Sequence, residues 1–263
     1  FTRYLYGVQN GVENDPKAWI VRETPPPAPG AAPATGARGR GAAPTPAPTP
    51  YADYPNPAAS PVALYPVSGG GAVGALANVQ PRSAIRETLI DDVQFSGADL
   101  AAAGTSTHRL LYATAELTAP VHLSGFSRVT ISVASSKAAA NLSVWLVQLP
   151  WTDGPIGTAN LITRGWADPQ NAASLTAGGD YHAKAPGVPL TPGKAVKMTF
   201  DLEPDDQIIP AGKRIGLMIF SSDKDFTLWP APGTELTVDL AGTSITLPVV
   251  GGADAFRKAT GGR

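Results

Sequence analysis

Histidine is the side chain best suited to proton transfer near neutral pH, and this sequence contains three, His108, His122 and His182. They form no His-x-x-x-His or His-Glu pair, so a zinc hydrolase would lack its set of ligands. His122 lies at the end of a predicted strand, and the other two lie in polar loops. We therefore expect all three to be ordinary surface or interface residues.

A serine nucleophile of the α/β-hydrolase type needs the pattern Gly-x-Ser-x-Gly, which holds the serine on a strained turn between a strand and a helix. The nearest strings begin at Gly104 and Gly125, and neither has the second glycine. The absence of cysteine excludes disulfides, thiolate metal clusters and a cysteine nucleophile. We expect no catalytic residue, cofactor or metal centre in this chain.

Three acidic clusters could supply oxygen ligands to calcium, which takes six to eight of them. They are Asp91-Asp92, Asp205-Asp206 and Asp223-Lys224-Asp225, and their spacing matches no EF-hand loop. Turn and capping roles are the favoured interpretation, and a structural calcium is the alternative.

Four tryptophans, Trp145, Trp151, Trp166 and Trp229, fall in the second half of the chain. An exposed row of such rings would stack against sugars, whereas core or interdomain packing would use their large apolar area. We expect Trp145 in the core, because its strand is apolar on both faces. Trp151 and Trp166 flank a loop and are candidates for an interface.

Composition limits the classes of partner. The chain has 263 residues, 43% of them apolar, and a net charge of -1, which suits one large or two small domains and favours neither nucleic acid nor an acidic membrane surface. Its apolar runs are shorter than the roughly 20 residues of a membrane helix. Because the first residue is Phe1, we expect a processed product or a fragment. The compartment stays open between cytoplasm and secretion.

The elements that must position these side chains divide the chain unevenly. Residues 25–66 hold 13 of the 27 prolines, and a glycine-rich run follows, so we expect a linker or insertion over 25–75. Before it, Phe1, Leu5 and Val8 have helical spacing, and residues 17–23 resemble a strand. Twenty-four residues cannot bury a core alone, so 1–24 is predicted to be the tail of another domain.

Beyond the linker, short strands with alternating apolar residues dominate, as at Val196, Met198, Phe200 and Leu202. Proline-glycine turns precede several of them. The pattern predicts an antiparallel β-sandwich over 76–252 and a flexible tail over 253–263. Further predicted strands are 129–133, 142–147, 215–220 and 236–240, of which the second and third are apolar on both faces.

Several ordered motifs carry a resemblance to a known family. The segments are Leu117–Gly125, Leu161–Trp166, Pro189–Gly193, Ile209–Ile215 and Ser221–Asp223. Together they resemble the C-terminal, galactose-binding-like jelly-roll domain of the Xaa-Pro dipeptidyl-peptidase family, which includes cocaine esterase and α-amino-acid ester hydrolases. Residues 1–16 are similar to the last helix and loop of that family's α/β-hydrolase domain, and 17–23 to the strand that follows.

The resemblance implies a serine hydrolase as the parent protein, which releases Xaa-Pro dipeptides or hydrolyses related esters or amides. Its serine, acid and histidine would lie upstream, because no position of this chain matches them. The resemblance implies that this chain packs on the upstream α/β-hydrolase domain and supports the substrate cleft; homo-oligomer formation by the parent is left open. The implied interdomain residues are Trp151, Arg164, Trp166, Ser221, Ser222 and Asp223.

Two other interpretations remain. A stand-alone carbohydrate-binding jelly roll would be favoured by coplanar exposed tryptophans. A structural or adhesive surface domain on a proline-rich stalk would explain the linker but not the ordered motifs.

Overall fold

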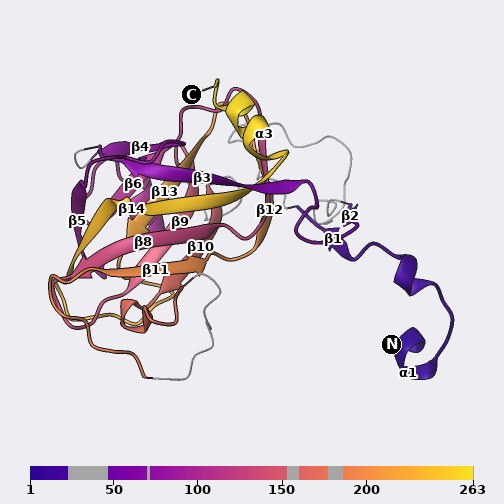
Figure 1. The fold of residues 1–263 in the computed structure, drawn as a ribbon, viewed down its shortest axis with the longest axis horizontal. Helices are drawn as coiled ribbons and strands as arrows, with labels where there is room; N and C mark the ends of the chain where they lie inside the picture. Colours follow the sequence, from indigo (N-terminus) through magenta and orange to yellow (C-terminus); the bar gives the residue numbers. More distant parts are fainter. Residues whose placement is uncertain (23–46, 70–71, 153–159, 177–185, 263) are drawn as a thin grey trace, which may run out of the picture.

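The computed structural model describes residues 1–22, 47–69, 72–152, 160–176 and 186–262 (Figure 1). Strands are its main regular element, and none of its helices is both long and apolar enough to cross a membrane. In chain order the elements are α1 (Thr2–Tyr6), η1 (Val12–Asn14), β1 (Ala18–Ile20), β2 (Thr49–Tyr51), β3 (Ala59–Val67), β4 (Val73–Ala77), β5 (Arg86–Ile90), α2 (Gly97–Ala102), β6 (Arg109–Ala113), β7 (Val121–Gly125), β8 (Arg128–Ser135), β9 (Leu142–Leu149), β10 (Leu161–Ala167), η2 (Pro169–Asn171), β11 (Val196–Asp201), β12 (Asp205–Ile209), β13 (Arg214–Phe220), β14 (Glu235–Val250) and α3 (Gly252–Ala259).

The strands form a jelly-roll β-sandwich, as the sequence predicts. One layer has the order β10-β9-β13-β6-β4, and the other gathers β12, β7, β14, β5, β8 and β11. The long strand β3 belongs to both layers, because residues 59–64 pair with β14 and residues 65–67 pair with β4. The pairings are antiparallel except for that of β4 with β6.

The core lies between the layers and follows from side-chain alternation. In β14, Leu236, Val238 and Leu240 are buried, while Thr237 and Asp239 between them are only partly buried. Each fully buried aliphatic side chain contributes roughly 1.5–3 kcal/mol relative to an exposed one. Strands β9 and β13 are buried on both faces, as predicted, because α2 covers the outer face of their layer at Trp145 and Phe220.

The predicted linker over 25–75 is wrong in its second half. Residues 23–46 lie outside the described residues, but 47–75 contribute β2, β3 and the start of β4. Prolines usually weaken a strand because they lack an N–H donor. In β3, however, Pro61 faces Pro248 of β14, and Val62, Leu64 and Pro66 alternate as buried positions.

The predicted flexible tail over 253–263 is also wrong for most of its length. Helix α3 begins at Gly252 and buries Phe256 and Ala259, three positions apart, against the core. The carbonyl oxygen of Ala259 accepts hydrogen bonds from the N–H and hydroxyl of Thr118. The final helix is therefore part of the packed structure.

Residues 1–22 form an N-terminal arm that leaves the sandwich and ends in α1 (Figure 1). The helix and strand predicted within 1–24 are confirmed as α1 and β1. The arm closes into a hook, since Arg3 pairs with Glu13 at 3.2 Å and Asn10 donates to Thr2 Oγ1 at 3.1 Å. Strand β1 joins it to the rest of the chain by pairing with β2.

Candidate functional site

Three of the six predicted interface residues meet at one end of the sandwich. Arg164 and Trp166 lie on β10, and Asp223 follows the end of β13. Their meeting point is the Asp223 carboxylate, whose Oδ2 accepts a hydrogen bond from Trp166 Nε1 at 3.0 Å and another from Trp145 Nε1 at 3.1 Å. We call Trp145, Arg164, Trp166, Asp223 and Phe226 the Asp223 cluster.

Aromatic rings surround the Arg164 guanidinium. Its carbon lies 3.9 Å from the centre of the Phe226 ring and 5.3 Å from that of Trp166, and those two rings stack at 5.4 Å. Such cation–π contacts contribute roughly 0.5–2 kcal/mol each, the larger values where the cation has lost its water. Arg164 Nε also lies 3.8 Å from Glu203 Oε2 at the rim. The cluster thus holds both β10 and the loop after β13 in place.

Opposing effects act on the pKa of the Asp223 carboxylate. Burial raises the pKa of Asp223 above its ordinary value, while the two indole hydrogen bonds and the nearby Arg164 charge act in the opposite direction. Asp223 Oδ1 and Arg164 Nε are buried and have no hydrogen-bond partner among the described residues. One acceptor and one donor of the cluster are therefore unpaired within the part of the chain that the structure describes.

The two serines beside Asp223 have an internal role. Ser222 donates its N–H and its hydroxyl to the two carboxylate oxygens of Asp91, at 2.8 and 3.0 Å. Ser221 donates to the carbonyl of Asn141 at 3.0 Å. Both serines are at most 2% exposed, so they anchor the loop and do not themselves present a surface.

Directly after Asp223 the loop presents three large apolar side chains to solvent. Phe226 is 51% exposed, Leu228 89% and Trp229 59%. We call these three residues the apolar ledge. Phe226 and Leu228 were not predicted from the sequence, because an exposed side chain in a loop follows no periodic pattern. Their only signal is that they lie close to Asp223 in the chain.

The remaining tryptophans are placed as follows. Trp145 is fully buried, as predicted. Trp151 lies beyond the end of β9 and packs, partly buried, against the core patch under α2. Because Trp145 is buried and Phe226 covers Trp166, two of the four tryptophans cannot join an exposed row for sugars.

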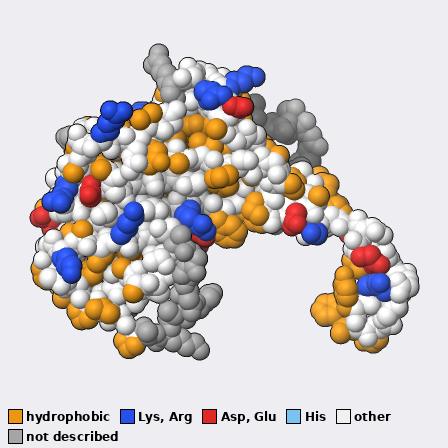
Figure 2. Space-filling model, in the orientation of Figure 1, with side chains coloured by type: hydrophobic (Ala, Val, Ile, Leu, Met, Phe, Trp, Pro, Cys, Tyr) orange, Lys and Arg blue, Asp and Glu red, His pale blue; other side chains and the backbone are white. Residues whose placement is uncertain are grey.

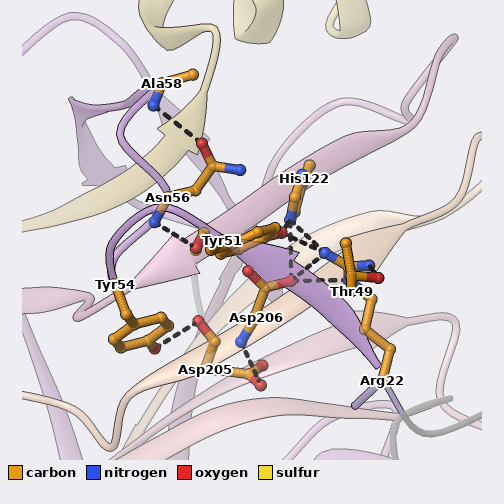
Figure 3. Close-up of polar contacts among 10 residues, drawn as sticks. Arg22, Thr49, Tyr51, Tyr54, Asn56, Ala58, His122, Asp205 and Asp206 are labelled. Atoms are coloured by element: carbon orange, nitrogen blue, oxygen red, sulfur yellow. Dashed lines mark hydrogen bonds and ion pairs between the residues drawn. The ribbon is translucent and has the colours of Figure 1, made fainter. Parts of the chain in front are cut away.

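A second polar cluster joins the arm to the sandwich (Figure 3). Asp206 Oδ1 on β12 accepts a hydrogen bond from Arg22 Nε at 2.7 Å and another from His122 Nε2 at 3.0 Å. The Arg22 guanidinium also donates to the Tyr51 hydroxyl and to Thr49 Oγ1, both on β2. We call these five residues the Asp206 junction, since they tie residues far apart in sequence.

Burial would raise the pKa of Asp206, but hydrogen bonds from Ser124, His122 and Arg22 together lower it below its ordinary value. The junction is therefore built around an ionised carboxylate. The sequence favoured a turn or capping role for Asp205-Asp206, with calcium as the alternative, and no pattern indicated Arg22. Among the described residues, no three acidic, histidine or cysteine side chains are grouped to hold a metal.

Ser124, His122 and Asp206 are the residue types of a catalytic triad, but their order is different. A triad needs the histidine between the serine and the acid. In the junction, Asp206 lies between Ser124 and His122, and the Ser124 hydroxyl is fully buried and accepts the N–H of Asn56 at 3.0 Å. The arrangement ties segments together and does not activate a nucleophile. His182 lies outside the described residues.

Comparison with known proteins gives a consistent result. Residues 10–257 match the family model described as the X-Pro dipeptidyl-peptidase C-terminal non-catalytic domain. A putative Xaa-Pro dipeptidyl-peptidase of Rhodopirellula baltica is 46% identical over 254 residues, which cover 96% of this chain and 36% of that protein. Another, of Streptomyces avermitilis, is 37% identical over 66% of this chain and 30% of that protein. The chain thus spans about a third of the length of these relatives.

Two solved structures share the fold. A CocE/NonD family hydrolase of Staphylococcus aureus aligns with a TM-score of 0.64 at 13% identity, covering 95% of this chain and 44% of that one. An α-amino acid ester hydrolase aligns with a TM-score of 0.50 at 15% identity, covering 72% and 36%. At these identities the likeness is one of fold.

Proposed function

Because the chain belongs to the family of X-Pro dipeptidyl-peptidase C-terminal non-catalytic domains, we propose that it supports the catalytic domain of a longer serine hydrolase that releases Xaa-Pro dipeptides. In that protein an upstream α/β-hydrolase domain supplies the serine, histidine and acid. The hydrolysis then proceeds through an acyl-enzyme on that serine. The part described here packs against the catalytic domain and keeps the substrate cleft in shape.

The observation that carries this proposal is the unburied apolar surface of the arm. Phe1 is 95% exposed, Tyr4 77% and Leu5 67%, and α1 buries no residue. Apolar atoms gather along one side of the hook in Figure 2. A short helix that leaves its aromatic side chains in water has little stability of its own. A second domain that covers them fits both this surface and the arm's place before the sandwich.

The apolar ledge is the second contact of the proposal. Its loop is fixed by the Asp223 cluster, in which the indole N–H groups of Trp145 and Trp166 both bond Asp223 Oδ2. Trp and Arg are the side chains enriched at such contacts. Trp151, Arg164 and Trp166 keep the interdomain role proposed for them, while Ser221, Ser222 and Asp223, each at most 2% exposed, act by fixing the loop.

The test uses the longer natural polypeptide in which the proposal places this chain. We expect it to hydrolyse Gly-Pro p-nitroanilide, and we expect the 263-residue chain alone to be inactive. The double variant Tyr4→Ser/Leu5→Ser removes two side chains, each worth roughly 1.5–3 kcal/mol when fully buried. It should lower both the melting temperature and kcat/KM, the latter at least tenfold.

Val79→Ser is the matched control, because Val79 is 70% exposed and lies outside the arm. It should melt and react as the unaltered protein does. Equal melting and equal activity of the arm variant and this control would refute the role of the arm. Absence of Gly-Pro amide hydrolysis by the longer polypeptide would refute the activity.

A further inference from the structure

A cleft beside α2 has a chemistry that the support role does not use. It lies between α2, β5 and the start of β6, and none of its lining residues belongs to the Asp206 junction. The residues of its wall that bear on its chemistry are Thr88, Phe95, Asp99, Ser106, His108 and Arg109.

Arg109 is a buried cation in the wall of this cleft. The residue is only 3% exposed, and its guanidinium donates hydrogen bonds to the carbonyl oxygens of Leu100 and Ala103 at the end of α2. No carboxylate among the described residues forms an ion pair with it. A buried charge without an opposite charge is costly, and the partial negative charge at the end of a six-residue helix offsets only part of that cost.

Arg109 also retains hydrogen-bonding capacity. A guanidinium has five N–H donors, and the two carbonyl oxygens take two of them. The remaining donors suit the two oxygens of one carboxylate. A carboxylate from outside the chain would supply both the missing charge and the missing acceptors.

His108 provides a second polar group of fixed orientation. Its Nδ1 lies 2.8 Å from the carbonyl oxygen of Ile90, which can only accept, so Nδ1 carries a proton and Nε2 of the neutral ring is an acceptor. The ring of Phe95 stacks on it with 5.1 Å between centres. The wall therefore combines an oriented imidazole with an apolar surface.

The charges of the cleft discriminate between anions. Asp99 is held by the N–H and the hydroxyl of Ser96, which lower its pKa, and Lys224 from the neighbouring loop lowers it further. A phosphate dianion would be repelled by the ionised Asp99. A monocarboxylate with an apolar body meets less repulsion and gains contact with Phe95.

We propose that this cleft binds the free carboxylate of a short peptide, with the carboxylate at Arg109 and the apolar residue against Phe95. The choice of a peptide among monocarboxylates rests on the proposed function, because a dipeptidyl-peptidase releases such carboxylates. The binding chemistry itself rests on Arg109 for the carboxylate, on Phe95 for the apolar residue and on His108 Nε2, an acceptor, for the amino group of the peptide.

The experiment titrates the 263-residue chain with Gly-Pro and with Gly-Pro amide, which lacks the carboxylate, and follows backbone amide signals by NMR. Gly-Pro should bind saturably and shift the signals of residues 106–110, and the amide should bind at least tenfold more weakly. His108→Ala and Arg109→Lys should each weaken Gly-Pro binding at least fivefold. The control Arg257→Ala removes an exposed arginine of α3 and should bind normally.

Thermal melting of each variant shows whether it is folded, and His108→Ala decides the question if Arg109→Lys does not fold, since the His108 ring is only half-buried. Equal affinity for Gly-Pro and its amide, shifts confined to other residues, or unaltered binding by His108→Ala would overturn the proposal. Acetate binding as tight as Gly-Pro would overturn the peptide assignment. Hydrolysis by the longer polypeptide is measured separately, so failure of this site leaves the proposed activity intact.

Discussion

A single methyl group added at Gly97 should disturb the Asp223 cluster through the ring of Trp145. A Cβ at this position would lie 2.3–2.8 Å from three carbons of the Trp145 ring. Carbon atoms pack at about 3.5–4.0 Å, so Trp145 or α2 must move by roughly 1 Å. Trp145 is fully buried and its Nε1 is bonded to Asp223, which leaves α2 to move away from the sandwich.

The expected cost of Gly97→Ala follows from this overpacking. Forcing an extra methyl group into a packed core costs about 1–3 kcal/mol. In a protein of this size, 1 kcal/mol lowers the melting temperature by roughly 2–4 °C, so we expect a decrease of about 2–12 °C. Differential scanning calorimetry of the 263-residue chain measures the shift, and tryptophan fluorescence reports the displacement at Trp145.

Gly104→Ala is a matched control in the same connection between β5 and β6. A Cβ there would have no neighbour within 4 Å, and the residue has no positive φ. This variant should melt within about 2 °C of the unaltered chain or slightly above it, because alanine restricts the unfolded state. If Gly97→Ala and Gly104→Ala melted alike, the close packing of α2 on Trp145 would be refuted.

The two buried carboxylates should respond to pH with opposite signs. Because the pKa of Asp206 is below its ordinary value of 3.8, its ionised form stabilises the fold at any pH above 3.8. Asp206→Asn should therefore lower the melting temperature most at pH 7. The difference should shrink as the pH falls below 3.8 and through the pKa of the folded state. The raised pKa of Asp223 means that its ionised form is disfavoured in the fold. In Asp223→Asn the amide oxygen still accepts the indole N–H groups, so this variant should melt at a higher temperature than the unaltered chain at pH 7. The difference in melting temperature should vanish below pH 3.8. A lower melting temperature of the variant at pH 7 would contradict this expectation. Phe256→Ala should cost about 3 kcal/mol in urea unfolding, whereas a dispensable tail would show no change.

The sandwich could be predicted from sequence because its strands alternate so regularly. Phe200 and Leu236 lie on faces that the period of two assigns to the core, and both are buried. The apolar residues on both faces of its strand also identified Trp145 as a core residue, and it is fully buried. By contrast, Pro61 and Pro66 argued against the strand that they occupy, because local propensity does not reveal that a neighbouring strand tolerates a proline at that register.

The candidate contacts also divide into those that the sequence reveals and those that it does not. Arg164, Trp166 and Asp223 were found through ordered motifs, and the structure brings them together. Arg22 was missed because its partner Asp206 lies 184 residues away in sequence. No local pattern encodes such a pairing.

Two attachment points give the proposed support role a physical basis. In the proposed role the arm leads to the catalytic domain, and the Asp206 junction fixes the arm to the sandwich through Arg22. Docking of the apolar ledge on the same domain is then an intramolecular step at high effective concentration. Such a contact can be small and still persist, which suits a ledge of only three exposed side chains. Loss of Arg22 would release the arm without removing any ledge contact, so Arg22→Ala should weaken docking of the ledge although the two lie in different parts of the fold.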